Sequence, residues 1–229
     1  MTPGFQALVI GSGGAIGAAF VRALRADPDC AGVREVSRSL GDGFDLSDPA
    51  SIEAQARACA ASGPYGLVID ATGVLTIDGK GPEKHLGALD AGHLARAFAL
   101  NTIGPALVLR HFAPLLAPGR ATYAKLSARV GSIGDNHKGG WYGYRASKAA
   151  MNMVLQTAAI ELQRRNPQLV VAALQPGTVR SGLSAAFAAG VPQLLEPDES
   201  ARGLLQALRQ LQPRPGAQFV DWRGEPIPW

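Results

Sequence analysis

The stretch ALVIGSGGAIG, residues 7–17, decides the fold of this chain. A short apolar run enters a glycine-rich turn, and an alanine-rich segment with helical character follows at once. Gly11 permits a tight turn, Gly13 and Gly14 let backbone N–H groups approach a ligand, and Gly17 lets the helix pack closely. The pattern predicts a helix N-terminus that faces a pyrophosphate. The alternative is a simple strand-to-helix turn.

Short apolar runs and longer helical stretches alternate along the rest of the chain. The predicted strands cover residues 6–11, 33–37, 66–71, 121–127, 169–175 and 217–222. The predicted helices begin near residue 13, after Asp48-Pro49, and at about residues 89, 142 and 197, with the third and fourth ending near 111 and 165. This alternation predicts an α/β fold: a single-domain, Rossmann-like, doubly wound parallel sheet flanked by helices over residues 1–229.

Composition and charge narrow the classes of function. Hydrophobic residues make up 47% of the chain and charged residues 17%, which is too apolar for disorder. The net charge of +4 is scattered, so we expect no nucleic acid partner. Cys30 and Cys59 are isolated and the histidines lack ligand spacing, which predicts a reducing compartment and no metal site. No stretch fits a signal peptide or a membrane span, so we expect a cytoplasmic protein.

The end of the second predicted strand bears on which dinucleotide binds. NAD-binding folds usually place a carboxylate there, whereas this chain has Ser37 followed by Arg38. An arginine can hold a 2′-phosphate through charge-assisted hydrogen bonds, so we expect NADP(H) rather than NAD(H). The alternative is that Arg38 is a surface charge and Glu35, on the same side of the strand as Ser37, faces the ribose.

A tyrosine and a lysine stand together in GGWYGYRASKAA, residues 139–150. Tyr144 and Lys148 are four positions apart on a predicted helix and therefore share one face. A nearby ammonium group lowers the pKa of a phenol from its usual ~10, which makes a tyrosine useful as a proton donor or acceptor near neutrality. Tyr142 cannot share that face and is expected to be a packing or pocket-wall residue. In isolation, an exposed tyrosine one turn from a lysine would be the simpler interpretation.

The order of motifs resembles the short-chain dehydrogenase/reductase family over nearly the whole chain. GSGGAIG matches the family's glycine motif, with Ala15 where glycine is usual, and DLSD at 45–48 looks like an adenine-contacting segment. DATG at 70–73 replaces the customary Asn-Asn-Ala-Gly, and Asn101, YRASK and PGTVRS match further motifs. Three segments are most similar in sequence to C-factor and sniffer-type carbonyl reductases: LSARVGSIGDN, GGWYGYRASKAAMNMV and FVDWRGEPIPW.

The resemblance implies an oxidoreductase that transfers hydride from NADPH to a carbonyl compound. Tyr144 would donate the proton, Lys148 would hold the nicotinamide ribose and lower the pKa of Tyr144, and Asn101 would anchor a water that links Lys148 to solvent. The implied partners are a small-molecule carbonyl or alcohol substrate and identical subunits in a homodimer or homotetramer. Beside Tyr144 and Lys148, the implied cofactor-binding residues are Gly11, Ser12, Gly13, Ala15, Ile16, Gly17, Ser37, Arg38, Asp45, Leu46, Ala71, Thr72, Gly73, Pro176, Gly177, Thr178 and Val179.

One catalytic position departs from the family pattern. The family has a serine that binds the substrate oxygen where this chain has Ala128. Strand alternation turns Ser127 away, so Ser132 in the following loop is the predicted replacement, and the open alternatives are Ser127 or no replacement. Without such a donor, a cofactor-binding sensor with little turnover is the alternative function. The loops 74–88 and 182–196 are expected to form an apolar lid over the substrate.

Overall fold

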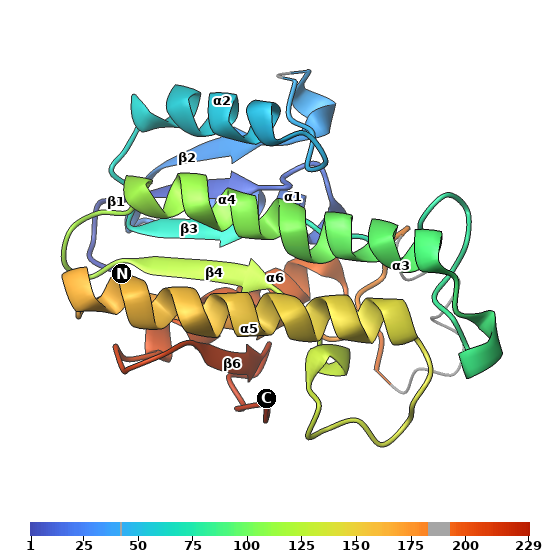
Figure 1. Ribbon diagram of the computed structural model, residues 1–229. Coiled ribbons are helices and arrows are strands. Elements are labelled where there is room, and N and C mark those ends of the chain that lie inside the picture. Colours follow the sequence, from blue (N-terminus) through green and yellow to red (C-terminus); the bar gives the residue numbers. More distant parts are fainter. Residues whose placement is uncertain (42, 183–192) are drawn as a thin grey trace.

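Six strands form one parallel sheet in the part of the chain that the computed structural model describes, residues 1–41, 43–182 and 193–229 (Figure 1). The sheet order is β2-β1-β3-β4-β5-β6, and every neighbouring pair is parallel. The strands are β1 (Phe5–Ile10), β2 (Cys30–Val36), β3 (Leu67–Asp70), β4 (Thr122–Leu126), β5 (Val170–Gln175) and β6 (Gln218–Asp221).

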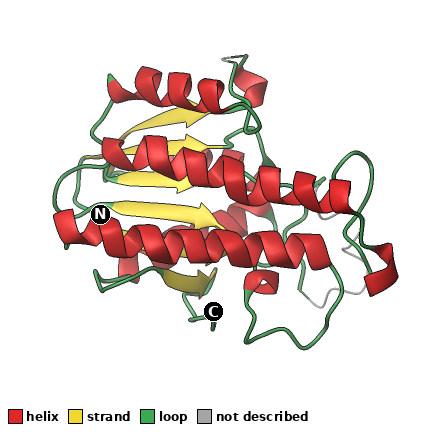
Figure 2. Ribbon diagram, in the orientation of Figure 1, coloured by secondary structure: helices red, strands yellow, loops and turns green. Residues whose placement is uncertain are grey.

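Helices cover both faces of the sheet (Figure 2). On one face, α1 (Ala15–Arg25) and α6 (Pro197–Gln210) share a buried core with inward residues of β1, β3 and β5. On the other face lie α2 (Pro49–Ala60), α4 (Gly104–Phe112) and α5 (Tyr142–Arg165), over a second core. The predicted doubly wound α/β class is confirmed, because both faces of each central strand are covered by apolar side chains.

The helix predicted from residue 89 to 111 is interrupted. It consists of α3 (Ala91–Phe98), a π-helical segment at Ala99–Ile103, and α4. Pro105 has no N–H group and cannot donate to the carbonyl of Asn101, so the helix widens where the sequence places this proline. The widened turn carries Asn101, whose side chain is buried beneath it.

Asp48 begins α2 as predicted: its carboxylate accepts a hydrogen bond from the Ala50 amide, with Pro49 as the first helical residue.

The strand order locates the crevice in which a ligand can bind. The chain turns from β1 to β2 on one side and crosses to β3 on the other, so β1 and β3 flank the switch point of the sheet. Ligands of open α/β sheets bind outside the carboxyl ends of strands at such a point. In Figure 1 the strand arrowheads point toward the N-terminal end of α5 and toward α3, which extend past the sheet.

Candidate active site

The glycine turn after β1 fits into the switch point of the sheet. Gly11 has a φ of +84°, and a Cβ there would lie 3.0 Å from the carbonyl carbon of Ala71 and 3.1 Å from the amide nitrogen of Thr72. A Cβ on Gly17 would overlap the carbonyl oxygen of Gly11, so helix α1 can approach the turn only with glycine there. The turn therefore lies directly against the segment that follows β3.

The N-terminus of α1 has the groups that a pyrophosphate needs. Gly14 is the N-cap and offers no side-chain acceptor, so the first amides of the helix have no capping partner from it. The Ser12 hydroxyl is buried beside them and has no hydrogen-bond partner in the described part of the chain. An orphan hydroxyl next to uncapped amides fits an anionic ligand. Ala15 and Ile16 lie in the first turn of the same helix.

The end of β2 lies beside this turn. A Cβ on Gly13 would collide with the Ser39 hydroxyl and would lie 3.2 Å from the Ser37 hydroxyl. Arg38 is exposed, whereas Glu35 pairs with Arg25 of α1 at 2.6 Å. The alternative in which Glu35 meets the ribose is therefore disfavoured, since an arginine already engages its carboxylate.

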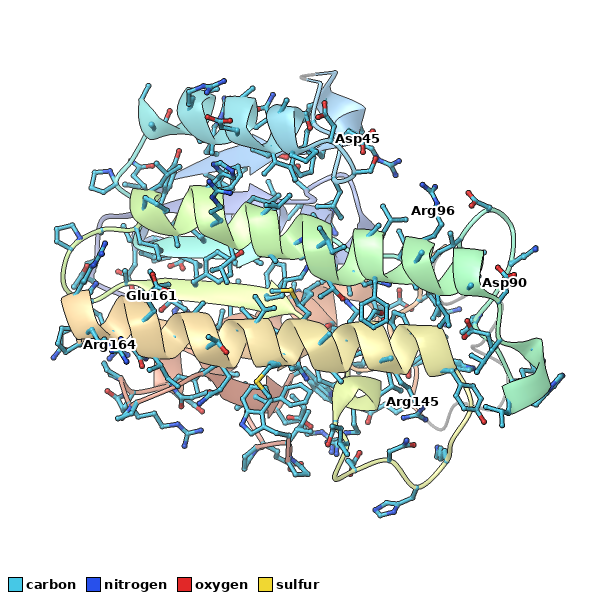
Figure 3. The ribbon with its side chains drawn as sticks, in the orientation of Figure 1. Asp45, Asp90, Arg96, Arg145, Glu161 and Arg164 are labelled. Atoms are coloured by element: carbon cyan, nitrogen blue, oxygen red, sulfur yellow. The ribbon has the colours of Figure 1, made fainter. Side chains whose placement is uncertain are left out.

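The DLSD segment lies further along the same edge. Asp45 is exposed near the start of α2 (Figure 3) and accepts hydrogen bonds from the amide and hydroxyl of Ser47. These two bonds hold the pKa of Asp45 below its ordinary value, with a smaller contribution from the Arg38 charge. Leu46 packs against the helix that follows the π-helical segment, because a Cβ on Gly104 would collide with the Leu46 backbone.

Helix α5 presents Tyr144 and Lys148 on one face, as predicted. The Lys148 ammonium lies 5.6 Å from the centroid of the Tyr144 ring. Gly73 has a φ of +146°, and a Cβ on it would lie 3.0 Å from Lys148 Nζ and 3.3 Å from Asn101 Oδ1. The structure thus gathers Gly73, Asn101, Tyr144 and Lys148, which come from the loop after β3, the π-helical segment and α5.

The side-chain amide of Asn101 links two parts of this cluster. Its Oδ1 accepts from the Val74 amide at 2.9 Å, and its Nδ2 donates to the Val74 carbonyl at 3.0 Å. Asn101 therefore joins the π-helical segment to the loop after β3, beside Gly73.

Burial dominates the protonation of the Tyr144–Lys148 pair. It raises the pKa of Tyr144 to about 12. The pKa of Lys148 falls to about 7, first through burial and then through repulsion from the Lys125 ammonium, against attraction from Asp70. The expectation that Lys148 lowers the pKa of Tyr144 is not met here. A buried lysine that loses its own proton near neutrality stabilises a phenolate poorly.

A carboxylate from the loop after β3 holds the N-terminus of α5. Glu83 accepts a hydrogen bond from the Gly143 amide at 2.9 Å, and its backbone carbonyl accepts from the Trp141 amide at 2.5 Å. Trp141 has the left-handed φ of +55° and meets the Tyr144 ring edge to face at 6.1 Å. Glu83 thereby holds the turn that orients Tyr144.

The Ser132 and Ser127 hydroxyls both have hydrogen-bond partners within the protein. Ser132 accepts a hydrogen bond from the Asp135 amide and lines a cavity of about 320 Å³ with Tyr142 and Arg145, and the lining of this cavity does not include Tyr144 or Lys148. Figure 3 shows Arg145, which donates to backbone carbonyls of the loop between β4 and α5. The Ser127 hydroxyl is buried and lies 2.6 Å from Asn152 Oδ1, to which it donates. Ser132 as the replacement donor therefore stays a prediction.

The segment 176–179 borders a second, polar cavity. Gly177 and Thr178 line a space of about 210 Å³ together with Arg129, Asp221 and Arg223. A Cβ on Gly177, whose φ is +78°, would lie 2.7 Å from the Leu195 side chain. Pro176 precedes this turn, and Val179 bridges to Leu195. Of the predicted lid at 182–196, residues 183–192 lie outside the described part of the chain.

Two residues near the site, Lys125 and Glu83, were not predicted from the sequence. Lys125 is the one charged residue of β4, all of whose residues are buried, and a charge in a strand covered on both faces is a signal that could have found it. Glu83 lies in an irregular loop, and nothing local distinguishes it from its exposed neighbour Lys84. Within the described ranges no three His, Cys, Asp or Glu side chains gather as a metal site. No described helix has both the length and the apolar character to cross a bilayer.

The chain is similar in sequence to a known family and to several known proteins. The family model of the short chain dehydrogenases matches residues 6–191. C-signal from Myxococcus xanthus is 32% identical over 169 residues, which cover 73% of this chain and 95% of that protein. The 1-hydroxy-2-glutathionyl-2-methyl-3-butene dehydrogenase of Rhodococcus sp. (strain AD45) is 32% identical over 188 residues, covering 82% of this chain and 79% of that enzyme.

A solved structure shares the fold over the whole chain. The NADPH-bound carbonyl reductase from chicken fatty liver superimposes with a TM-score of 0.84. The match covers 100% of this chain and 96% of that one, at 22% sequence identity.

Proposed function

The chain belongs to the short chain dehydrogenase family, and from that membership we propose that it transfers hydride from NADPH to the carbonyl carbon of an aldehyde, ketone or quinone. The predicted family resemblance, including the likeness to C-factor, is confirmed by the family match and by C-signal. The observation that carries the proposal is the shared face of Tyr144 and Lys148, with the ammonium 5.6 Å from the phenol ring and Gly73 pressed against it.

The cofactor proposal rests on the fit of the glycine turn. The uncapped N-terminus of α1 and the orphan Ser12 hydroxyl would hold the pyrophosphate, and Arg38 would hold a 2′-phosphate. When bound, NADPH supplies the hydride. The NADPH-bound chicken reductase, which has the same fold, is consistent with this choice. The remaining proposed contacts are Asp45 and Leu46 toward adenine, residues 71–73, and residues 176–179 toward nicotinamide.

Tyr144 is suited to donating a proton. With a pKa of about 12 it keeps its proton throughout the neutral range, so it can supply that proton as the substrate oxygen becomes negative. Lys148 is proposed to hold the nicotinamide ribose, and hydroxyl acceptors there would favour its charged form. Asn101 is proposed to place water behind Lys148, at the π-helical turn that Pro105 creates.

The decisive experiment compares two tyrosines of the same helix. Tyr144→Phe should abolish NADPH oxidation across a panel of aldehydes, ketones and quinones, while the Kd for NADPH, measured by fluorescence, stays within about threefold of wild type. Tyr142→Phe is the matched control and should retain turnover. Full activity of Tyr144→Phe would reassign the proton donor.

A second candidate is an NADP(H)-binding signalling or sensor protein with little turnover. The similarity to C-signal and the alanine at position 128 favour it. The two functions share the cofactor site and differ in turnover, so the same carbonyl panel separates them. Robust oxidation of NADPH with any member of the panel would remove the sensor as the main function.

Assembly and location belong to the proposal as well. A homodimer or homotetramer is proposed through the long helices around α4 and α5, which expose Ile103, Met153 and Ile160. The cytoplasm is the proposed compartment, consistent with the free thiols of Cys30 and Cys59. The single-domain organisation over residues 1–229 is likewise proposed. Sedimentation velocity of the purified chain tests the assembly.

A further inference from the structure

Asp70 and Lys125 form an ion pair inside the sheet. They are register partners on β3 and β4, Lys125 Nζ lies 3.0 Å from Asp70 Oδ1, and both side chains are 0% exposed. Burying two charges costs desolvation free energy that their attraction largely cancels, and apolar residues in their place are often as stable. The pair therefore calls for an explanation other than fold stability.

The pair clamps the first residues after β3. Lys125 Nζ donates to the Thr72 carbonyl at 2.5 Å and lies 3.1 Å from the Thr72 hydroxyl. Asp70 Oδ1 accepts from the Thr72 amide at 2.9 Å and from its hydroxyl at 2.6 Å. Every polar group of Thr72 thus meets one of the two charges, so the position of the next residue, Gly73, depends on the pair.

Lys148 approaches the same turn from α5. Its Nζ would lie 3.0 Å from a Cβ on Gly73, and it donates to the carbonyl of Leu126, the residue after Lys125, at 3.4 Å. Two lysine side chains from different elements therefore converge on residues 72–73. Lys125 is paired with the Asp70 carboxylate, and Lys148 lies beside the Tyr144 ring.

We propose that Asp70 and Lys125 are positioning residues for Lys148: they hold the turn against which its side chain lies and, through their charges, set how readily it is protonated. The inference rests on the role proposed for Lys148 in catalysis. Neither residue of the pair contacts the reacting atoms, because both side chains are 0% exposed.

The charges of Lys125 and Asp70 shift the pKa of Lys148 in opposite directions. Among the described residues, the Lys125 ammonium lowers the pKa of Lys148 and the Asp70 carboxylate raises it, and the lysine effect is the larger. Tyr144 lies on the same helix as Lys148 and Tyr123 on the same strand as Lys125, and burial raises the pKa of each phenol, so both are neutral. The pair as a whole therefore favours the uncharged form of Lys148.

The test reads the protonation of Lys148 directly, without cofactor or substrate. The chain has five lysines, so the ¹³Cε signals of ¹³C-lysine protein can be resolved and followed by NMR as the pH changes. Lys125→Met should raise the pKa of Lys148 by about one unit or more, because the repelling ammonium is gone and Asp70 remains. Asp70→Asn/Lys125→Met should raise it less, because the attracting carboxylate is also gone. Lys138→Met, at an exposed loop position, is the control and should leave it unchanged.

The double variant protects the test from a failure to fold, since it leaves no lone buried carboxylate. If the single variant does not fold, a Lys148 pKa above wild type in the double variant still supports the proposal. A Lys148 pKa that matches wild type in the double variant, or a single variant that does not exceed the double, would overturn it.

Turnover adds a separate readout. The alkaline limit of kcat/KM for carbonyl reduction should move to higher pH in the order wild type, double variant, single variant. The activity of Tyr144→Phe tests the proposed function and does not depend on the ion pair. The order of the Lys148 pKa values measured by NMR tests the ion pair and needs no turnover, so the two proposals can fail separately.

Discussion

The Glu83 carboxylate accepts a hydrogen bond from the Gly143 amide at 2.9 Å, one residue before Tyr144. A side chain from the loop over the proposed substrate site therefore holds the helix end that carries the proposed proton donor. The second carboxylate oxygen, Oε1, has no hydrogen-bond partner in the described part of the chain and lies 3.9 Å from His93 Nε2. Loop position and tyrosine orientation are coupled through this one residue.

Glu83→Ala should lower the free energy of unfolding by about 1–3 kcal/mol, because it leaves the Gly143 amide buried without its acceptor. It should also lower kcat more than it raises KM, since Tyr144 loses its fixed orientation. Glu83→Gln keeps an acceptor oxygen and should recover most of both quantities. Urea unfolding and steady-state kinetics measure them.

The matched control is Glu161→Ala on the same helix. Glu161 is exposed toward the far end of α5 (Figure 3), and its replacement should change stability by no more than about 0.5 kcal/mol. Equal destabilisation by both variants would contradict the anchoring role of Glu83.

Lys148 should make the stability of the protein without cofactor rise with pH. Its pKa is about 7 in the folded chain and 10.5 when unperturbed, so the unfolded state binds more protons between these values. The free energy of unfolding should therefore increase from about pH 7 toward pH 10. Lys148→Met should flatten this rise in thermal or urea unfolding at several pH values. An unchanged slope in the variant would show that other groups produce it.

NADPH binding should take up protons near neutral pH. Contact with ribose hydroxyls favours the charged form of Lys148, so its pKa rises on binding and the protein gains a fraction of a proton at pH 7–8. Calorimetric titrations in buffers of different ionisation enthalpy measure this uptake, and Lys148→Met should abolish most of it. Proton release in wild type would contradict the assignment.

Arg38→Ser should weaken NADPH binding by roughly 10- to 100-fold, because a charge-assisted contact to the 2′-phosphate is lost. NADH lacks that phosphate, and its Kd should stay within about twofold. Fluorescence titrations of the same variant with NADPH and with NADH measure both Kd values, and the NADH value is the control. A parallel loss for both would mean that Arg38 supports the fold of the site and does not read the phosphate.

Ala128→Ser should raise turnover by about tenfold or more, because it restores a hydroxyl donor at the position where the family binds the substrate oxygen. Ser132 lines a cavity with Tyr142 and donates to no described group, so Ser132→Ala should change turnover by less than about threefold. A loss of about 10²-fold in Ser132→Ala would instead identify Ser132 as the donor, as the sequence pattern predicts.

Local signals in the sequence determined the order of strands and helices, the glycine turn, the N-cap at Asp48 and the shared face of Tyr144 and Lys148. Each depends on residues a few positions apart, through chain geometry and hydrophobic periodicity. The end of α5 at Arg165 and its start at Tyr142 follow the prediction for the same reason.

Only the tertiary structure decided what surrounds that pair. Lys125 meets Asp70 across 55 positions of sequence, and Glu83 meets Gly143 across 60. Ser132 is close to Tyr144 in sequence, yet its hydroxyl accepts a hydrogen bond from the Asp135 amide of its own loop. The sequence predicts that Lys148 lowers the pKa of Tyr144, because the two are one helical turn apart. In the fold, burial raises the pKa of Tyr144 to about 12, and burial and the Lys125 charge lower that of Lys148.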